Sequence, residues 1–160
     1  GSKFLYPGCG YGGSCFPKDV KALVKTAENR GYEMRVLKAV EEVNENQKHI
    51  VFNKLCKHYN GELHGKVIAI WGLAFKPDID DLRESPAKYI TTKVLQGCNN
   101  ADILVVEPNI SSHNVFKLTP YRMAYEKADI VVFLVTHKEF KSLPICPDKM
   151  ILDFAGVFRK

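Results

Sequence analysis

The distribution of apolar and polar positions separates the chain into a helical first part and an alternating second part. Residues 17–30 and 33–59 carry apolar side chains at near-helical intervals, so each stretch predicts a helix. In the longer stretch the polar residues Asn44 and Gln47 interrupt the apolar stripe. One small domain cannot cover so long a helix, and we expect it to pack against other helices or against a second subunit.

From residue 66 onward, short apolar runs of strand length alternate with helical segments. The runs lie at residues 67–71, 103–106, 130–135 and 150–153, and the helical segments at residues 86–96 and 121–127. Such alternation with short connections is typical of parallel sheets. We therefore predict the α/β class, with a long central helix plus a Rossmann-like, doubly wound parallel sheet. We expect a cysteine loop with central dimerisation helices at residues 1–60 and a Rossmann-like domain at residues 61–160.

Composition and charge narrow the class of protein. The 160 residues are 46% hydrophobic and 26% charged, as in ordinary globular proteins. A net charge of +5 without a dense Lys/Arg run disfavours a nucleic-acid partner, and no apolar stretch suits a membrane helix. The five cysteines form no CxxC pair, so we expect no metal site and a reducing cytoplasm as the setting. The Gly1-Ser2 pair is typical of an expression tag, and we expect a longer parent protein.

The strongest chemical signal is the decapeptide Gly10-Tyr11-Gly12-Gly13-Ser14-Cys15-Phe16-Pro17-Lys18-Asp19. Its glycines let backbone N–H groups approach an anion closely. Cys15 precedes a predicted helix start, where a thiolate is stabilised and becomes a good nucleophile. Lys18 adds positive charge nearby, and the carboxylate of Asp19, one helical turn along, can hold or activate a water molecule. The pattern predicts a catalytic cysteine.

A second candidate segment, residues 72–86, follows the first predicted strand. In a parallel sheet such a loop lies at the carboxyl edge, where ligands bind. Lys76 can pair there with a phosphate or a sugar hydroxyl, and Arg83 can engage a second phosphate with its planar guanidinium. The plainer alternative is that Asp80, Asp81 and Arg83 cap the next helix and pair with each other. The glycines of a GxGxxG turn are missing, which disfavours a standard dinucleotide site in this sheet.

The cysteine decapeptide resembles the catalytic-cysteine motif of the UDP-glucose/GDP-mannose dehydrogenase family, and residues 3–158 as a whole resemble that family's later part. The resemblance implies a UDP-sugar 6-dehydrogenase, which oxidises C6 of a UDP-hexose to the uronate with two NAD through a cysteine thiohemiacetal and thioester. It also implies that residues 61–160 bind UDP and that the long helix forms a homodimer. The family's NAD-binding domain has no counterpart in the sequence, so we expect the chain alone to be inactive.

The resemblance assigns roles to individual residues. Cys15 is implied to be the nucleophile, and Asp19 is implied to assist the hydrolytic water. The substrate is expected to contact Tyr6, Pro7, Gly8, Cys9, Gly10, Tyr11, Gly12, Phe75 and Lys76. NAD is expected to contact Cys15, Phe16, Pro17, Lys18 and Arg83.

The identity of the sugar stays open at this point. The cysteine loop resembles UDP-glucose enzymes, which we favour because this loop lies nearest the reacting carbon. Two segments, residues 78–86 and 104–109, resemble the UDP-N-acetylmannosamine branch, as does Ala155, which replaces the arginine of an Asp-Gly-Arg ending. Another alternative is a non-catalytic UDP-binding and dimerisation module. A cysteine acyltransferase or hydrolase would need a histidine base, and no histidine lies in a motif near Cys15.

Overall fold

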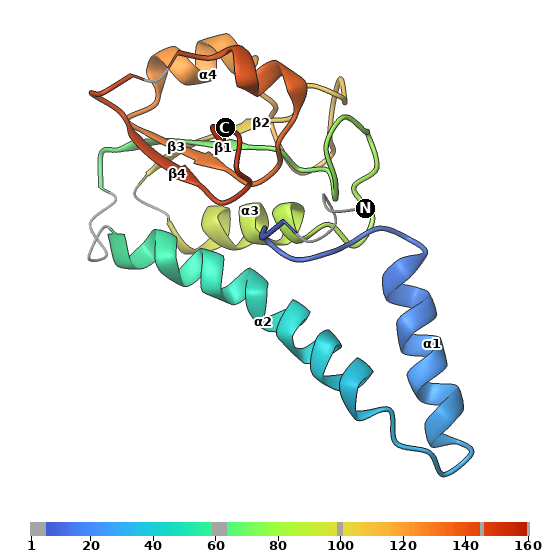
Figure 1. Cartoon of the computed structure of the whole chain (residues 1–160). Coiled ribbons are helices and arrows are strands. Elements are labelled where there is room, and N and C mark those ends of the chain that lie inside the picture. The colour runs from blue at the N-terminus through green and yellow to red at the C-terminus, as the bar shows by residue number, and fades with distance from the viewer. Residues whose placement is uncertain (1–5, 59–63, 99–100, 145, 160) are drawn as a thin grey trace.

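The structure is a computed structural model that describes residues 6–58, 64–98, 101–144 and 146–159. Helices and strands alternate in the order (Figure 1) α1 (Phe16–Glu28), α2 (Arg35–His58), β1 (Val67–Trp71), α3 (Pro86–Gly97), β2 (Asp102–Val106), α4 (Tyr121–Lys127), β3 (Ile130–Phe133), a 3-10 helix (Lys138–Ser142) and β4 (Met150–Asp153). Each helix and strand expected from the hydrophobic pattern is present. The Gly1-Ser2 pair and the expected boundary at residues 60 and 61 lie outside the described residues. Within the described ranges, no helix has the length and apolar character needed to cross a membrane.

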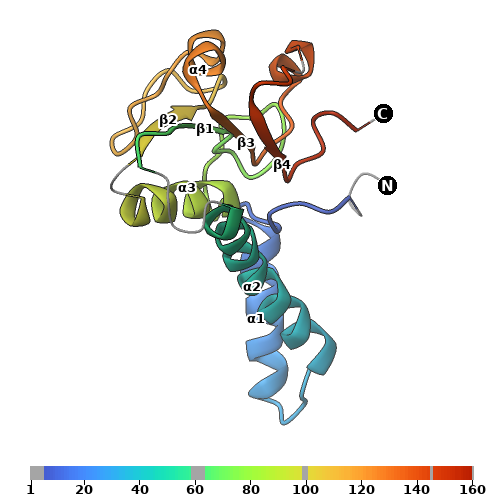
Figure 2. The ribbon, with the colours of Figure 1, turned by 90° about the vertical axis from the view of Figure 1, so that its left-hand side faces the viewer.

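The four strands form one parallel sheet in the order β2-β1-β3-β4. In the centre, Ile70 of β1 lies opposite Val105 of β2 and Val132 of β3. The crossover through α3 covers one face of the sheet, and the crossover through α4 covers the other (Figure 1, Figure 2). Because the chain reverses its direction across the sheet after β2, the predicted doubly wound α/β arrangement is confirmed.

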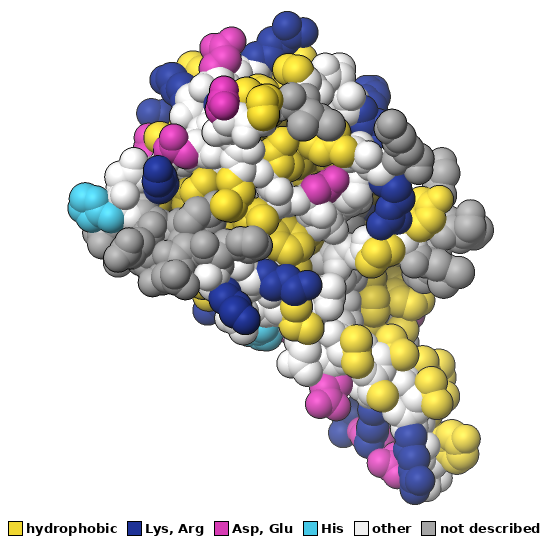
Figure 3. All heavy atoms as spheres, turned by 60° about the vertical axis from the view of Figure 1, so that its left-hand side comes forward, with side chains coloured by type: hydrophobic (Ala, Val, Ile, Leu, Met, Phe, Trp, Pro, Cys, Tyr) yellow, Lys and Arg dark blue, Asp and Glu magenta, His cyan; other side chains and the backbone are white. Residues whose placement is uncertain are grey.

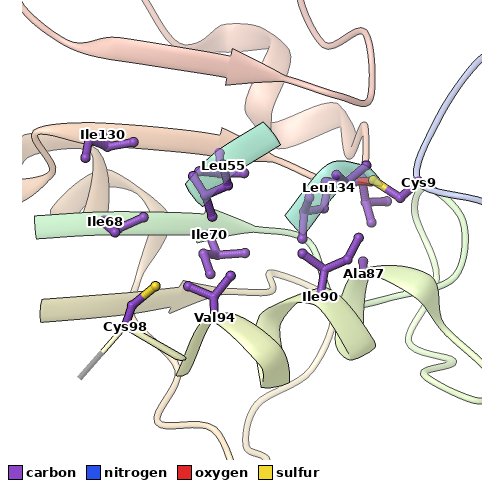
Figure 4. Close-up of a cluster of buried hydrophobic side chains, with 13 residues drawn as sticks. Cys9, Leu55, Ile68, Ile70, Ala87, Ile90, Val94, Cys98, Ile130 and Leu134 are labelled. Carbon is purple, nitrogen blue, oxygen red and sulfur yellow. The ribbon is translucent and has the colours of Figure 1, made fainter. Parts of the chain in front are cut away.

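Each face of the sheet has its own buried cluster. On the face covered by α3, Ile70 packs with Ile90 and Val94 (Figure 4). On the opposite face, Trp71 is fully buried and lies edge-on to Phe140, with the ring centroids 4.8 Å apart. Successive residues of a strand point to opposite faces, so the central strand β1 serves both clusters. The sheet therefore has a buried cluster on each of its two faces, and the loops that follow its strands lie at its carboxyl edge.

Helix α2 packs against α1 and α3, as expected, but its two halves have different surroundings. Val51 and Leu55 in the second half are buried in the cluster that contains the residues of α3. In the first half, Val36 and Val43 expose 75% and 66% of their surface. This half and α1 project together from the sheet (Figure 2), and apolar side chains gather along the projection (Figure 3). The second subunit stays a prediction.

The third strand is shorter than its apolar run predicts. It ends at Phe133, because the N–H groups of Leu134 and Val135 both donate to the carbonyl of Trp71. The 3-10 helix that follows was not expected from the sequence pattern. It covers the sheet with the buried side chain of Phe140 and brings the chain back to the start of β4.

Leu55 connects α2 to the sheet, and shortening its side chain tests how firmly the helix is held. We expect Leu55→Ala to lower the free energy of unfolding by about 2–5 kcal/mol, because the residue is fully buried and a cavity would remain. Val36→Ala, on the exposed half of the same helix, is the control and should change it by about 0.5 kcal/mol or less. Urea unfolding followed by the fluorescence of Trp71 measures both, and equal losses would contradict this packing.

Candidate functional site

Cys15 lies where the glycine-rich loop, residues 6–15, meets the first turn of α1. It is the N-cap of the helix, its side chain is exposed, and its carbonyl accepts the N–H of Asp19 at 2.9 Å. Asp19 is also exposed and forms an ion pair with Lys18 at 3.6 Å. The first turn of α1 therefore presents a thiol, a carboxylate and an ammonium group to solvent together.

Helix α2 holds the glycine-rich loop through polar side chains. The amide of Asn44 forms a pair of hydrogen bonds with Tyr11, accepting its backbone N–H at 2.7 Å and donating to its carbonyl at 3.1 Å. Gln47 donates to the carbonyl of Gly8 at 2.8 Å. The hydroxyl of Tyr11 donates to Glu41, and burial together with this bond raises the pKa of Tyr11. The residues that interrupt the apolar stripe of α2 are thus those that bind the loop backbone.

The other side of the loop rests on the segment between β1 and α3. The N–H of Gly13 donates to the carbonyl of Arg83 at 3.0 Å. A Cβ atom on Gly12 would lie 2.2 Å from the carbonyl oxygen of Glu84. A Cβ atom on Gly13, where φ is +94°, would lie 2.9 Å from the ring of Phe75. Only glycine permits so close an approach, so these two positions are needed to dock the loop on the sheet.

Arg83 pairs with Asp81, as one part of the plainer alternative expected. The guanidinium donates to both carboxylate oxygens, with 2.7 Å as the shortest distance. The expectation that these residues cap α3 is wrong, because the hydroxyl of Ser85 takes that role and accepts the N–H of Lys88 at 3.2 Å. The side-chain hydrogen bond from Arg83, followed by its backbone hydrogen bond, lowers the pKa of Asp81 to about 2. Asp81 in turn raises the pKa of Arg83, and the charge of Cys15 adds to this effect.

A cavity of about 610 Å³, which we call the edge cavity, lies where the glycine-rich loop crosses the carboxyl edge of the sheet. It brings together seven of the expected substrate contacts, Tyr6, Pro7, Gly8, Cys9, Gly10, Phe75 and Lys76. Sequence reasoning missed Lys141 and Arg159, which line it as well. Both follow strands of the sheet, and ligands bind beyond the carboxyl ends of parallel strands, so this rule points to the connections that carry them but does not single out the two residues. The three cationic side chains suit an anionic ligand such as a diphosphate.

Cys9 is the buried member of this lining. It exposes 5% of its surface, and its Sγ atom lies 3.7 Å from the carbonyl oxygen of Leu134 (Figure 4). Burial raises the pKa of the Cys9 thiol to about 12. A thiol in this state is a packing group, so the exposed Cys15 is the better nucleophile in the loop.

A second and more apolar hollow of about 1030 Å³ lies between the loop and the first half of α2. Phe75 and Lys76 line both hollows, and Tyr11, Gly12 and Phe16 line only the apolar one. Its far wall consists of α2 side chains, among them Val36, Val40 and Val43. The expected substrate contacts therefore surround two adjoining spaces. The expected nucleophile and most expected cofactor contacts, which are Cys15, Pro17, Lys18 and Arg83, line neither space.

Neither a general base for the cysteine nor a metal centre emerges from the described histidines. In the described part of the chain, no hydrogen bond or ion pair joins a histidine to Cys15. Asp78, His137 and Glu139 place potential ligand atoms within 4.8 Å of one another. However, Nδ1 of His137 already accepts the N–H of Asp78 at 3.0 Å, which occupies its lone pair. The acyltransferase alternative therefore gains no support.

A doubly wound parallel sheet with a cavity at its carboxyl edge places the chain among the doubly wound α/β proteins, which bind ligands at that edge. Two models of the UDP-glucose/GDP-mannose dehydrogenase family match it. The central domain of that family matches residues 1–46, and its UDP binding domain matches residues 69–160. Since the second match alone covers more than half of the sequence, the chain belongs to this family.

Curated relatives and solved structures agree with this assignment. The chain is 40% identical over 152 residues to the UDP-glucose 6-dehydrogenase of Pseudomonas aeruginosa, a match that covers 88% of the chain and 33% of the relative. It is 43% identical over 155 residues to the UDP-N-acetyl-D-mannosamine dehydrogenase of Campylobacter jejuni, covering 92% and 36%. A UDP-glucose dehydrogenase structure from Pyrobaculum islandicum matches with a TM-score of 0.79 at 29% identity, covering 94% and 35%. The chain spans about a third of the length of these curated relatives.

The pair of hydrogen bonds from Asn44 can be tested by removing its amide. We expect Asn44→Ala to speed hydrogen exchange at the Tyr11 amide at least about tenfold, because the N–H loses its protein partner. The free energy of unfolding should fall by about 1–2 kcal/mol. Asn46→Ala removes an exposed amide from the same helix and is the matched control. Exchange followed by NMR measures the effect, and unchanged protection of Tyr11 would show that α2 does not hold the loop.

Proposed function

We propose that the chain is the C-terminal part of a UDP-sugar 6-dehydrogenase, with UDP-glucose as the favoured substrate. One observation carries the proposal. The loop that ends in Cys15 is docked onto the carboxyl edge of a sheet from a UDP-binding domain family, and it walls a cationic cavity there. The proposed nucleophile and one wall of the proposed nucleotide cavity therefore belong to the same docked loop.

In the proposed reaction, Cys15 acts at C6 after the alcohol has become an aldehyde. The thiolate adds to the aldehyde carbon and forms a thiohemiacetal on the cysteine. NAD, when bound, would supply the hydride acceptor for both oxidations of C6, that of the alcohol and that of the Cys15 thiohemiacetal. Water then hydrolyses the resulting Cys15 thioester, which releases the carboxylate and restores the thiol. Asp19, which lies one turn along α1 and is open to solvent, is proposed to hold and activate that water.

NAD is proposed to lie mainly on another part of the full-length enzyme. The turn after β1 reads Gly72-Leu73-Ala74-Phe75 and lacks the glycines of a dinucleotide turn. Lys18 and Arg83 are exposed cations near the N-terminus of α1, and they fit a pyrophosphate that approaches from outside. Contacts of NAD with Cys15, Phe16 and Pro17 are proposed on the same surface. The chain alone is accordingly expected not to reduce NAD.

The edge cavity is proposed to bind the diphosphate of the UDP-sugar through Lys76, Lys141 and Arg159. Arg159 lies over the ring of Tyr6 at 5.0 Å from its centroid. The turn that carries it is held by the carboxylate of Asp153, which accepts backbone N–H groups from residues 155 to 158. This turn supplies a guanidinium although the chain has an alanine where an Asp-Gly-Arg ending would have arginine.

A UDP-N-acetylmannosamine dehydrogenase is the alternative within the same chemistry. The relative from Campylobacter jejuni and the C-terminal Asp153-Phe154-Ala155 sequence favour it. A non-catalytic UDP-binding and dimerisation module is compatible with the same cavity. Turnover by the full-length enzyme, compared for the two UDP-sugars, separates these three possibilities.

We propose the cytoplasm as the setting of the enzyme and a UDP-sugar as its small-molecule partner. All five cysteines are free, as reducing compartments keep them. Nucleic acid is not proposed as a partner, because the net charge is only +5 and the sequence has no dense Lys/Arg run.

Nucleotide binding by the chain is the direct test of the proposed function. We expect isothermal titration to detect UDP binding and weaker or no binding of GDP. Lys76→Ala should raise the dissociation constant for UDP about tenfold, because one charged hydrogen bond to phosphate is lost. Lys127→Ala, at the exposed end of α4, is the matched control and should leave the constant unchanged. Absence of heat with both nucleotides would refute the proposal.

A homodimer through α2 is proposed from the apolar side chains that its first half exposes. Val36, Val40 and Val43 lie on this half and are exposed. We expect sedimentation to show a dimer at about 100 μM and Val43→Glu to shift it towards monomer, since a buried unpaired carboxylate opposes association. Leu95→Glu on α3 is the control. A wild-type chain that sediments as a monomer at this concentration would contradict the proposal.

A further inference from the structure

The turn that carries Phe75 and Lys76 is fastened by a buried ionisable pair outside the expected site. Glu107 follows β2 and His137 follows β3, and both side chains are completely buried. One carboxylate oxygen of Glu107 accepts the N–H groups of Leu73 at 2.8 Å and Ala74 at 3.0 Å. Burial opposes the charged form of Glu107, but the hydrogen bonds from His137 and from the backbone outweigh it and lower its pKa.

The hydrogen bonds define the tautomer of His137. A backbone N–H can only donate, so the bond from Asp78 N–H at 3.0 Å requires an unprotonated Nδ1. The side-chain nitrogen of Asn109, which carries only N–H donors, also lies 2.9 Å from the same atom. The proton of the neutral ring therefore sits on Nε2, which donates to Glu107 at 3.2 Å. The imidazole connects a carboxylate on one side to the loop backbone on the other.

The result is a segment held at both of its ends. Glu107 binds residues 73 and 74, and His137 binds residue 78, so that Phe75 and Lys76 lie between two fixed points. Asp78 adopts a left-handed conformation at φ +59°, and its carboxylate accepts the N–H of Lys138 at 2.9 Å. A non-glycine residue keeps such a conformation only when its surroundings enforce it.

The ammonium group of Lys76 depends on this backbone for its position. In the described part of the chain no salt bridge holds Lys76, and its Nζ atom lies 5.4 Å from the centroid of the Phe75 ring. A long lysine side chain without a fixed partner loses rotamer entropy when it binds an anion. If its backbone is already fixed, binding adds little further loss of backbone entropy.

We propose that Glu107 and His137 are positioning residues that fix the turn of residues 73–78 and so hold Lys76 in place for the anionic part of the nucleotide. This inference rests on the proposed function, because it concerns the same edge cavity. Neither Glu107 nor His137 lines that cavity, so they act on the ligand only through the turn.

Two substitutions of His137 test its Nδ1 and Nε2 hydrogen bonds one at a time. In His137→Asn the shorter amide places its oxygen near the former Nδ1 and still accepts the N–H of Asp78. In His137→Gln the longer amide reaches Glu107 but leaves the N–H of Asp78 without its acceptor. By titration with UDP, we expect His137→Gln to raise the dissociation constant about tenfold and His137→Asn to raise it less than about threefold. Their melting temperatures should fall by similar amounts.

A double-mutant cycle with Lys76→Ala distinguishes positioning from general loosening. If the turn acts through Lys76, His137→Gln should not weaken UDP binding further in the Lys76→Ala background. Should the tenfold loss persist there in full, or should His137→Gln bind UDP like the wild type, the inference is overturned. A wild-type chain that binds no UDP would instead defeat the proposed function, and the inference would fall with it.

A second variant keeps the buried pair intact in case substitutions of His137 unfold the chain. Asp78→Gly removes the bond to Lys138 at a partly exposed side chain, and glycine tolerates the left-handed conformation. Because Asp78 lines the edge cavity, its control is Asp78→Asn, which removes the same charge but keeps an oxygen that can accept the N–H of Lys138. We expect Asp78→Gly to bind UDP about threefold more weakly than Asp78→Asn, with melting temperatures within a few degrees of each other. Equal affinity of the two variants would count against the positioning of Lys76 by this turn.

Discussion

The hydrogen-bonded docking of the glycine-rich loop between α2 and the β1–α3 segment is the constraint on which the whole site depends. A loop without regular structure must find partners for its peptide groups outside itself. Here Asn44 and Gln47 supply them on one side, and the carbonyl of Arg83 supplies one on the other. The edge cavity exists because this docked loop forms one of its walls. The glycines at positions 12 and 13 matter for the same reason, since any side chain there would push the wall away.

Charge is distributed in two layers at the carboxyl edge of the sheet. The outer layer faces the cavity and has a net positive charge, with Lys76, Lys141 and Arg159 against the carboxylate of Asp78. The inner layer is the buried carboxylate of Glu107, which is surrounded by N–H donors and by His137. A buried carboxylate that is fully hydrogen-bonded orders the surrounding backbone. The buried negative charge of Glu107 therefore fixes the backbone of residues 73 and 74 and does not line the cavity.

Much of the fold followed from the sequence, because the strands and helices have distinct hydrophobic periods. The runs at 67–71 and 150–153 coincide with β1 and β4, and the doubly wound order follows from short crossovers. The position of Cys15 at a helix start was equally readable from Pro17 and Asp19. The meaning of Asn44 and Gln47 was not, since the pattern showed only that they interrupt a stripe. Their partners lie more than thirty residues away in the chain, and no local rule pairs them.

The same limit explains Lys141 and Arg159. Their place at the cavity depends on how the connections after β3 and β4 return over the sheet, which periodicity does not encode. The pairing of Asp81 with Arg83 was readable because the two residues are close in sequence, whereas the separation of Cys15 from the edge cavity is a tertiary fact. Contacts between residues close in sequence were thus predictable, whereas contacts between segments far apart in the chain became visible only in the structure.

One consequence follows from the way α2 serves two tasks along a single rigid rod. Asn44 and Gln47 face the loop, and Val51 and Leu55 face the core under the sheet. Each residue of an α-helix turns the next by about 100° and advances it by about 1.5 Å. Inserting or deleting one residue between Gln47 and Val51 would therefore rotate one set away from its partner while the other stayed seated. In this stretch the number of residues matters more than their identity. It sets the angle and the distance between the side chains that bind the cysteine loop and those that pack under the sheet.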